Sequence, residues 1–220
     1  MKILKVLFIS FLATTLMIGC EDDDNVTPNN PTEGKSEVDQ FSMLEVGNYW
    51  IYERYTIDTN GIETALGIYD SSYVEKDTLI NGKLYAVLIL PSYLSNFNKD
   101  FILRDSLDYL VDHRGKILFA LNNFNSLLYS NYNLISATDT IYHHTRKMKD
   151  KDSLVSVPAG TFLTYNAYEK VDYMGSFSPL VDHSINKLYA KGIGLIYNTQ
   201  VRYSSATESP VQKLVRYSVQ

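Results

Sequence analysis

The fold class is decided by residues 48–57, NYWIYERYTI. Successive side chains of a strand point to opposite faces, so Trp50 and Tyr52 are expected on one face and the residues that alternate with them on the other. Both faces carry large apolar groups, which predicts a strand near the core. Asn60-Gly61 follows, and Asn-Gly favours a tight hairpin because both residues accept positive φ. The sequence therefore predicts an antiparallel partner strand directly after this turn.

The same signals recur along the chain, which contains 18 Tyr and 9 Phe, residues typical of strands. Asn81-Gly82 joins two β-prone runs, and residues 101–121 resemble a further hairpin around a turn at 113–115. The pattern breaks at 91–100, which predicts a loop, and at 122–133, which predicts irregular structure or a short helix. Expected strands cover 49–57, a run after 62, 72–79, 83–90, 101–112, 116–121, 140–148, 153–157, 162–173, 187–191, 195–203 and 211–219.

Merging neighbouring runs leaves about ten strands and little helix, which predicts an all-β fold. Consecutive short strands joined by turns favour an antiparallel meander that curls into an open barrel or a sandwich. Residues 39–220 are therefore expected to form a single β-rich domain, long enough to bury a sizeable core.

Residues 1–19 have the layout of a secretion signal. Lys2 and Lys5 form a short positive region, and an uncharged run of about 13 residues then ends at Gly19. This run is shorter than the ~20 residues that a helix needs to cross the hydrocarbon core of a membrane. The sequence therefore predicts a cleaved signal peptide and no permanent membrane span.

Residues 16–20, LMIGC, resemble the lipobox of bacterial lipoproteins, in which the cysteine is acylated and the preceding bond is cut. Cys20 is the single cysteine of the chain, so it cannot form an internal disulfide. We expect Cys20 to carry acyl chains such as palmitate and to make the membrane a partner of the mature protein. An ordinary signal followed by a chance cysteine is the alternative.

Residues 20–38 predict a lipidated, disordered tether. An acidic run, EDDD, follows Cys20, and the remainder is rich in Asn, Pro, Thr and Gly, which cannot bury enough surface to fold. The acidic run resembles the export tag of lipoproteins sent to the outer face of the outer membrane. This predicts an outer-membrane protein at the cell surface, with the periplasmic face as the alternative, and a run that merely keeps the tether extended is also open.

The charge of the chain argues against nucleic acid as a partner. Loss of Lys2 and Lys5 with the signal leaves 18 basic and 25 acidic residues. Affinity for a phosphate backbone comes from Lys and Arg, so this balance is unfavourable. The one basic stretch, which contains Lys147, Lys149 and Lys151, predicts a solvated strand end.

Motifs near both ends of the domain resemble a group of uncharacterised bacterial lipoprotein domains. They are VGNYWIYE at 46–53, VPAGTF at 157–162 and YAKGIGLI at 189–196. The resemblance implies an antiparallel sheet around an apolar interior, loosely like the lipoprotein carriers LolA and LolB, and it does not imply an enzyme. Physically, the motifs predict a tight turn at 158–160 and a bulge or close backbone approach at Gly192 and Gly194.

Candidate chemistry is sparse. Adjacent His143 and His144 would lie on opposite faces of a strand, and the sequence has no short zinc-binding spacing, so no metal site is predicted. No phosphate-cradling loop or nucleophile elbow is present, so no cofactor is predicted and an enzyme is not expected. A glycosidase, which uses two carboxylates, is the catalytic alternative. The acid pairs considered for it are Asp105 with Asp108 and Asp70 with Glu75.

The leading hypothesis is a non-catalytic binding module whose curled sheet encloses a small apolar or amphiphilic ligand. The alternative is an interaction or accessory subunit of a cell-envelope or glycan-uptake assembly, which would bind an envelope protein through an exposed apolar face. The residues predicted to contact a ligand flank the family motifs and are Trp50, Tyr52, Phe162 and Tyr189.

Overall fold

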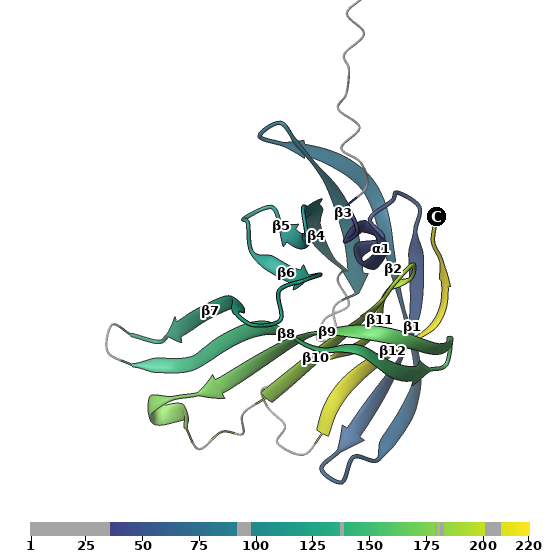
Figure 1. Cartoon of the computed structure of the whole chain (residues 1–220). Coiled ribbons are helices and arrows are strands. Elements are labelled where there is room, and N and C mark those ends of the chain that lie inside the picture. The colour runs from purple at the N-terminus through teal and green to yellow at the C-terminus, as the bar shows by residue number, and fades with distance from the viewer. Residues whose placement is uncertain (1–35, 92–97, 137–138, 179, 181–182, 201–207) are drawn as a thin grey trace, which may run out of the picture. The chain divides into compact units, whose positions relative to one another are not determined.

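A computed structural model describes residues 36–91, 98–136, 139–178, 180, 183–200 and 208–220. These residues form one antiparallel sheet of twelve strands, in the spatial order β6-β5-β4-β3-β2-β1-β12-β11-β10-β9-β8-β7 (Figure 1). In the described part of the chain, no helix is long and apolar enough to cross a membrane. The elements are α1 (Asp39–Ser42), β1 (Tyr49–Asp58), β2 (Glu63–Ile80), β3 (Lys83–Pro91), β4 (Asn98–Ser106), β5 (Tyr109–Asp112), β6 (Ile117–Ala120), β7 (Leu127–Leu134), β8 (Thr140–Val157), β9 (Gly160–Tyr173), the 3-10 turn η1 (Gly175–Phe177), β10 (His183–Ala190), β11 (Gly194–Thr199) and β12 (Glu208–Ser218).

The sheet curls until its two edges approach each other. Its edge strands, β6 and β7, are consecutive along the chain, and β6 also contacts β8 and β9. The result is a nearly closed barrel. This confirms the predicted all-β antiparallel class and selects the barrel over the sandwich.

The two Asn-Gly turns are confirmed, because β1 pairs with β2 and β2 pairs with β3 across them. The structure has twelve strands, more than the roughly ten that were expected. The expected strand at 101–112 divides into β4 and β5 at Leu107, whose φ of 55° turns the chain. Conversely, 140–148 and 153–157 belong to one strand, β8, because a bulge with positive φ at Asp150 and Asp152 bends the strand without ending it.

The expectation of irregular structure or a short helix over 122–133 is wrong for 127–133, although 122–126 are irregular. Leu127–Leu134 form the edge strand β7, which pairs with β8 through most of its length. Its side chains are mostly exposed on both faces, so its sequence has none of the alternation that marks a half-buried strand. The hydrogen bonds offered by β8 hold this segment extended. Of the expected loop at 91–100, residues 92–97 lie outside the described residues, whereas Pro91 belongs to β3 and 98–100 belong to β4.

Side chains from β8 join the open edge of the barrel. Arg146 Nη1 donates a hydrogen bond of 2.7 Å to the carbonyl oxygen of Ile117 on β6. The backbone N–H of Ala120, also on β6, donates to Met148 Sδ at 3.3 Å. Edge strands carry backbone groups without a strand partner, and here two of them are satisfied by side chains across the seam.

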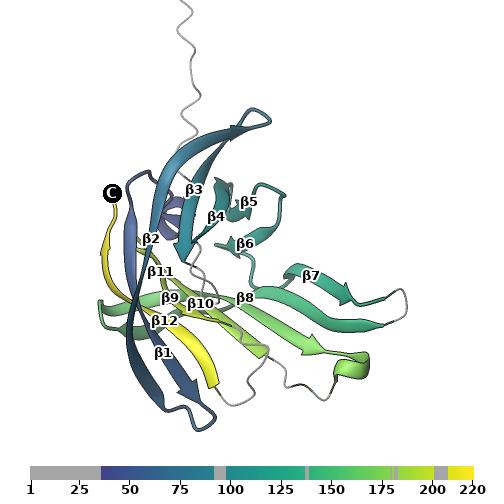
Figure 2. The same ribbon diagram turned by 180° about the vertical axis from the view of Figure 1, so that it is seen from behind.

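Helix α1 lies inside the curve of the sheet, as the two opposite views show (Figure 1, Figure 2). Val38 and Phe41 are buried, and the Phe41 ring lies 5.4 Å from Phe119 of β6 and 4.7 Å from Tyr165 of β9 between ring centroids. These contacts make α1 a plug between strands that are distant in the sheet. Because Val38 is fully buried, the packed domain includes a residue that the sequence assigned to the tether.

Trp50 and Asn48 explain why the opening motif contains those residues. Trp50 is 4% exposed, and its Nε1 donates to the carbonyl oxygen of Ile193 at 2.6 Å. Gly194 has a φ of 95°, and a Cβ there would lie 3.4 Å from the indole, so the close backbone approach predicted at this glycine is confirmed. The fully buried Asn48 amide donates to Met43 O and accepts from the N–H of Gln220, which ties α1 to the chain end.

Replacement of Trp50 tests its role in the core. We expect Trp50→Ala to lower the free energy of unfolding by about 3–5 kcal/mol, because it opens a cavity in one of the two core clusters. Trp50→Phe should cost about 1–2 kcal/mol, mainly because the Ile193 carbonyl loses its donor. Urea unfolding followed by circular dichroism measures both. Tyr69→Ala on β2, at a side chain that is 60% exposed, is the control and should change stability by about 0.5 kcal/mol or less; an equal effect of Trp50→Ala and Tyr69→Ala would contradict the assignment.

Candidate functional site

The barrel contains a partly open cavity of about 510 Å³. One part of its lining is apolar and comes from β3 to β6, another is charged and comes from β8 to β10, and β1 contributes aromatic side chains. The apolar part comprises Leu88, Leu90, Phe101, Leu103, Leu110 and Leu118. The charged part comprises His144, Arg146, Glu169 and Lys187, with Lys116 beside it on the turn before β6.

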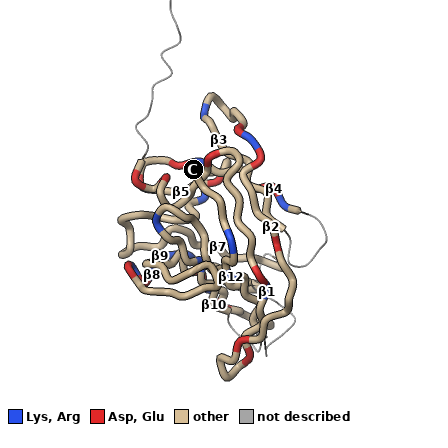
Figure 3. The backbone as a smooth tube through the Cα atoms, turned by 90° about the vertical axis from the view of Figure 1, so that its right-hand side faces the viewer, with Lys and Arg blue, Asp and Glu red and all other residues tan. Residues whose placement is uncertain are grey.

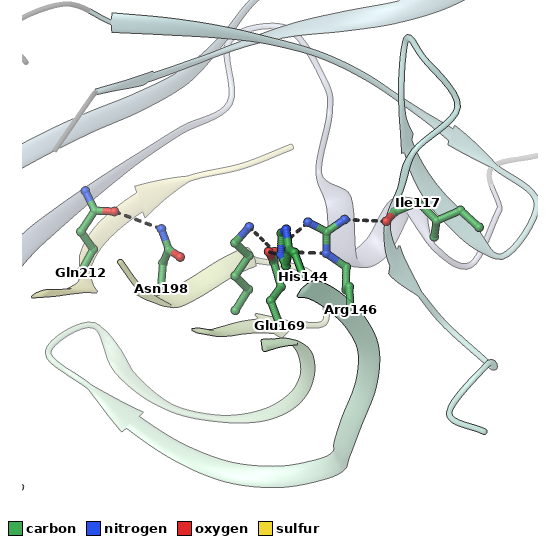
Figure 4. Close-up of polar contacts among 7 residues, drawn as sticks. Ile117, His144, Arg146, Glu169, Asn198 and Gln212 are labelled. Atoms are coloured by element: carbon green, nitrogen blue, oxygen red, sulfur yellow. Dashed lines mark hydrogen bonds and ion pairs between the residues drawn. The ribbon is translucent and has the colours of Figure 1, made fainter. Parts of the chain in front are cut away.

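Glu169 is the centre of the charged part. Its Oε1 accepts from Arg146 Nη2 at 2.7 Å, from Arg146 Nε at 3.1 Å and from Lys187 Nζ at 2.7 Å. Its Oε2 lies 2.6 Å from His144 Nε2. Figure 4 shows Arg146 between Glu169 on one side and the Ile117 carbonyl on the other. The same guanidinium therefore belongs to the cavity and to the seam.

The surroundings of Glu169 determine its charge state. The Glu169 and Arg146 side chains are 4% and 3% exposed. Burial by itself raises the pKa of Glu169, but the charge of Lys187, the hydrogen bond from His144 and the charge of Arg146 outweigh it and hold the pKa well below its ordinary value. Glu169 is therefore an anion inside the barrel, stabilised by three partners.

Lys116 lies in the same cluster, but its surroundings disfavour its charged form. Burial lowers the pKa of Lys116 first, and the nearby charge of Arg146 lowers it further. Its Nζ lies 3.7 Å from the ring centroid of Tyr129, a cation–π contact. Its backbone N–H is bound by Asp112 Oδ1, which forms the turn between β5 and β6.

A second polar network reaches the cavity from β1, β2, β11 and β12. Arg54 binds both carboxylate oxygens of the buried Asp70, at 2.6 and 2.7 Å, and Gln212 donates to Asp70 at 2.5 Å. Gln212 in turn accepts from Asn198, which lines the cavity (Figure 4). This chain of hydrogen bonds fixes the amide of Asn198 at the cavity wall.

Three of the four residues predicted to contact a ligand line this cavity: Trp50, Tyr52 and Tyr189. Tyr52 is buried, and its hydroxyl donates to Leu195 O at 2.7 Å. Phe162 is absent from the described lining, because it lies beside Gly160 at the β8–β9 turn and packs against a core cluster. The turn predicted at 158–160 is present there, with Val157 paired to Gly160. Cys20 lies outside the described residues.

The charged residues of the cavity were not predicted from the sequence. His144, Arg146 and Met148 alternate along β8 with Lys147 and Lys149, which are exposed as predicted but lie in the middle of β8 and not at a strand end. Alternation predicts that His144, Arg146 and Met148 share the face of the strand opposite to Lys147 and Lys149. Nothing in the sequence shows that this face points into the barrel. Basic and acidic residues lie on many strands of the sheet (Figure 3). Their positions in the sequence therefore do not show which of them form a cluster.

The adjacent histidines face opposite sides, as predicted. His143 stacks on Tyr132 with ring centroids 4.2 Å apart and contacts Ser130, whereas His144 binds Glu169 inside the barrel. Across the described residues, no group of three or more His, Cys, Asp or Glu side chains is arranged to hold a metal ion.

The acids considered for a glycosidase have separate partners. Asp105 accepts from Ser42 Oγ at 2.7 Å, and burial together with the charge of Asp39 raises the pKa of Asp105 to about 7 despite that hydrogen bond. Asp108 accepts from Asn122, and Asp70 belongs to the network of Arg54. The activity of these pairs stays a hypothesis.

Comparisons with known proteins identify no family for this chain. No protein-family model matches it, and no curated protein matches it. Two solved structures are similar over 81% of the chain, each with a TM-score of 0.42. One is a candidate exported protein with a YmcC-like fold from Bacteroides fragilis, 14% identical and covered over 98% of its length. The other is a candidate lipoprotein from Parabacteroides distasonis, 13% identical and covered over 97%. The resemblance of the three sequence motifs to a lipoprotein group stays a prediction.

Glu169→Gln tests the charged cluster. We expect it to lower the free energy of unfolding at neutral pH by about 3–5 kcal/mol, because Arg146 is left buried without an anion. Glu75→Gln on β2, where the carboxylate is 43% exposed, is the matched control and should change stability by about 0.5 kcal/mol or less. Chemical unfolding of the three proteins measures these differences.

The same variant predicts a pH dependence. The pKa of Glu169 is lower in the folded protein than its ordinary 4.5, so the folded state binds fewer protons than the unfolded state. The stabilisation is present above pH 4.5 and is lost progressively as the pH falls below it. The wild-type protein should therefore lose more stability than Glu169→Gln on acidification, and parallel pH profiles would contradict this explanation.

Proposed function

We propose that this chain is a surface-displayed outer-membrane lipoprotein, anchored through Cys20, that acts as a non-catalytic binding module for an amphiphilic ligand. The observation that carries the proposal is the cavity of about 510 Å³ inside the barrel, lined on one part by leucines and on another by charges. Small-molecule sites commonly measure about 300–1,000 Å³ and combine an apolar surface with a few placed polar groups.

The width of the barrel supports a ligand rather than a filled core. About eight strands leave an interior that side chains just fill, and larger barrels leave open space. This sheet has twelve strands, and α1 occupies only part of the interior through Phe41 and its neighbours. A ligand that combines apolar and polar groups would match the remaining lining.

A second function is supported by exposed leucines at two hairpins. Leu79 and Leu84 pair across β2 and β3 and are 71% and 60% exposed, and Leu154 and Leu163 pair across β8 and β9 with similar exposure. Exposed apolar side chains that lie together mark interaction surfaces. These pairs favour an accessory subunit that contacts an envelope protein as the second candidate.

Cys20→Ser tests the anchor. The wild-type chain should incorporate a clickable palmitate analogue in a bacterial host and sediment with outer membranes, because the acyl chains hold it there. The variant should lose the label and keep residues 1–19 uncleaved, so that it no longer sediments with outer membranes. Protease treatment of intact cells then separates surface display, in which the protein is degraded, from the periplasmic face. A variant that keeps the label would refute lipidation at Cys20.

Native mass spectrometry tests the ligand. The full chain with Cys20→Ser, purified without detergent, should carry a small-molecule adduct that organic extraction removes. Leu88→Trp should reduce the adduct, because the indole would fill the cavity that Leu88 lines. Leu84→Trp on the same strand, at a side chain that is 60% exposed, is the matched control and should retain it. An adduct-free wild-type protein that also fails to bind added amphiphiles would overturn the binding-module proposal.

A further inference from the structure

We infer that the ligand is an anionic amphiphile, whose charged oxygen atoms bind Lys116 beside Arg146 and Lys187 while its apolar chain lies along the leucines of β3 to β6. This inference rests on the proposed function and names its ligand class. It follows from three observations: the charge balance of the cavity, the unused donors on its cations and the position of its apolar surface.

The cavity has an excess of positive charge within an acidic protein. The whole chain has a formal net charge of −5. Among the described residues, the cavity lining nevertheless contains four cations, Lys99, Lys116, Arg146 and Lys187, and two carboxylates, Asp112 and Glu169. Buried charges such as Arg146 are screened less than charges at the surface, so this excess favours an anion.

Lys116 is a partly buried cation of this cavity whose charge is only partly compensated by the carboxylates around it. In the described part of the chain it forms no ion pair, and its ammonium contacts the ring of Tyr129. The nearby Glu169 already binds Arg146 and Lys187, and Asp112 Oδ1 accepts from two backbone N–H groups of the turn. An anion supplied by a ligand would offset the burial and the repulsion from Arg146 that disfavour a charged Lys116.

The neighbouring cations have donors to spare for the same anion. Arg146 has five N–H donors, and three of its contacts go to Glu169 and Ile117. Lys187 has three donors and uses one on Glu169, and its side chain is 30% exposed. A carboxylate or phosphate between these groups would receive charge-assisted hydrogen bonds, which are about twice as strong as neutral ones.

The apolar surface begins beside this cluster. Leu118 follows Lys116 by two residues, and Leu103 and Leu110 on the paired strands β4 and β5 are almost fully buried yet line the cavity. Leu88 extends this surface onto β3. One hydrocarbon chain attached to an anionic head can therefore contact the leucines while its head contacts Lys116.

The test compares dodecanoate, dodecanol and dodecyltrimethylammonium, which share one alkyl chain and differ in head charge. Binding to the full chain with Cys20→Ser is measured below micelle-forming concentrations by calorimetry or by displacement of a fluorescent apolar dye. We expect dodecanoate to bind about tenfold more tightly than dodecanol, and the cation to bind most weakly. Lys116→Met should remove most of the preference for dodecanoate and leave dodecanol binding unchanged, whereas Lys116→Arg should keep the preference.

Lys76→Met is the matched control, since Lys76 is 64% exposed on β2 and absent from the described cavity lining. Equal binding of all three amphiphiles would overturn the anionic head while leaving the binding module intact. Binding of none of them would overturn both proposals. A loss of dodecanoate binding that is the same in Lys116→Met and Lys76→Met would also overturn the role of Lys116. Dodecyl phosphate, compared with dodecanoate, distinguishes a phosphate from a carboxylate head.

Discussion

One guanidinium joins the barrel's edge to its interior. Arg146 binds Glu169 on β9 and the carbonyl oxygen of Ile117 on β6. In the sheet order, β6 is one edge strand and β9 lies near the opposite edge. An antiparallel sheet that curls without closing leaves backbone groups of its edge strands unpaired, and water or side chains must satisfy them. Here Arg146 and Met148 satisfy two such groups on β6. Residues on both sides of this seam, Leu118 of β6 and Arg146 of β8, line the cavity.

Burying a cluster of charges between strands costs free energy, because the charges lose their hydration. The partners within this cluster offset part of that cost. Removing a charge from water is unfavourable, and it is offset only where the partners are close and hydrogen bonded. Glu169 has Arg146, Lys187 and His144 within 2.7 Å of its oxygens, so its own charge is well compensated. Lys116 has no comparable partner among the described carboxylates, so the cluster ends in an excess of positive charge on the cavity side.

Apolar side chains fill part of the barrel interior and leave another part open as the cavity. Phe41 of α1 packs against Phe119 and Tyr165 and fills one region, and Trp50 lies against Gly194 and fills another. Leu88 packs against both core clusters and also lines the cavity between them. A barrel of twelve strands is too wide for its own side chains to fill completely, so the plug reduces the interior space without removing it.

Local patterns in the sequence determined the strands and their turns. Alternation at 48–57, the Asn-Gly turns and the glycines of the YAKGIGLI motif act through nearest neighbours or through backbone φ, and the fold follows them. The motifs that resemble a lipoprotein group, and not these local patterns, led to Trp50, Tyr52 and Tyr189, which line the cavity, and to Phe162, which is absent from its described lining. Only the tertiary structure decided that β7 is a strand, that β6 returns to β8 and that His144, Arg146, Glu169 and Lys187 share one interior face. Those outcomes depend on how far a twelve-stranded sheet curls, a property of all strands together that no local stretch of sequence specifies.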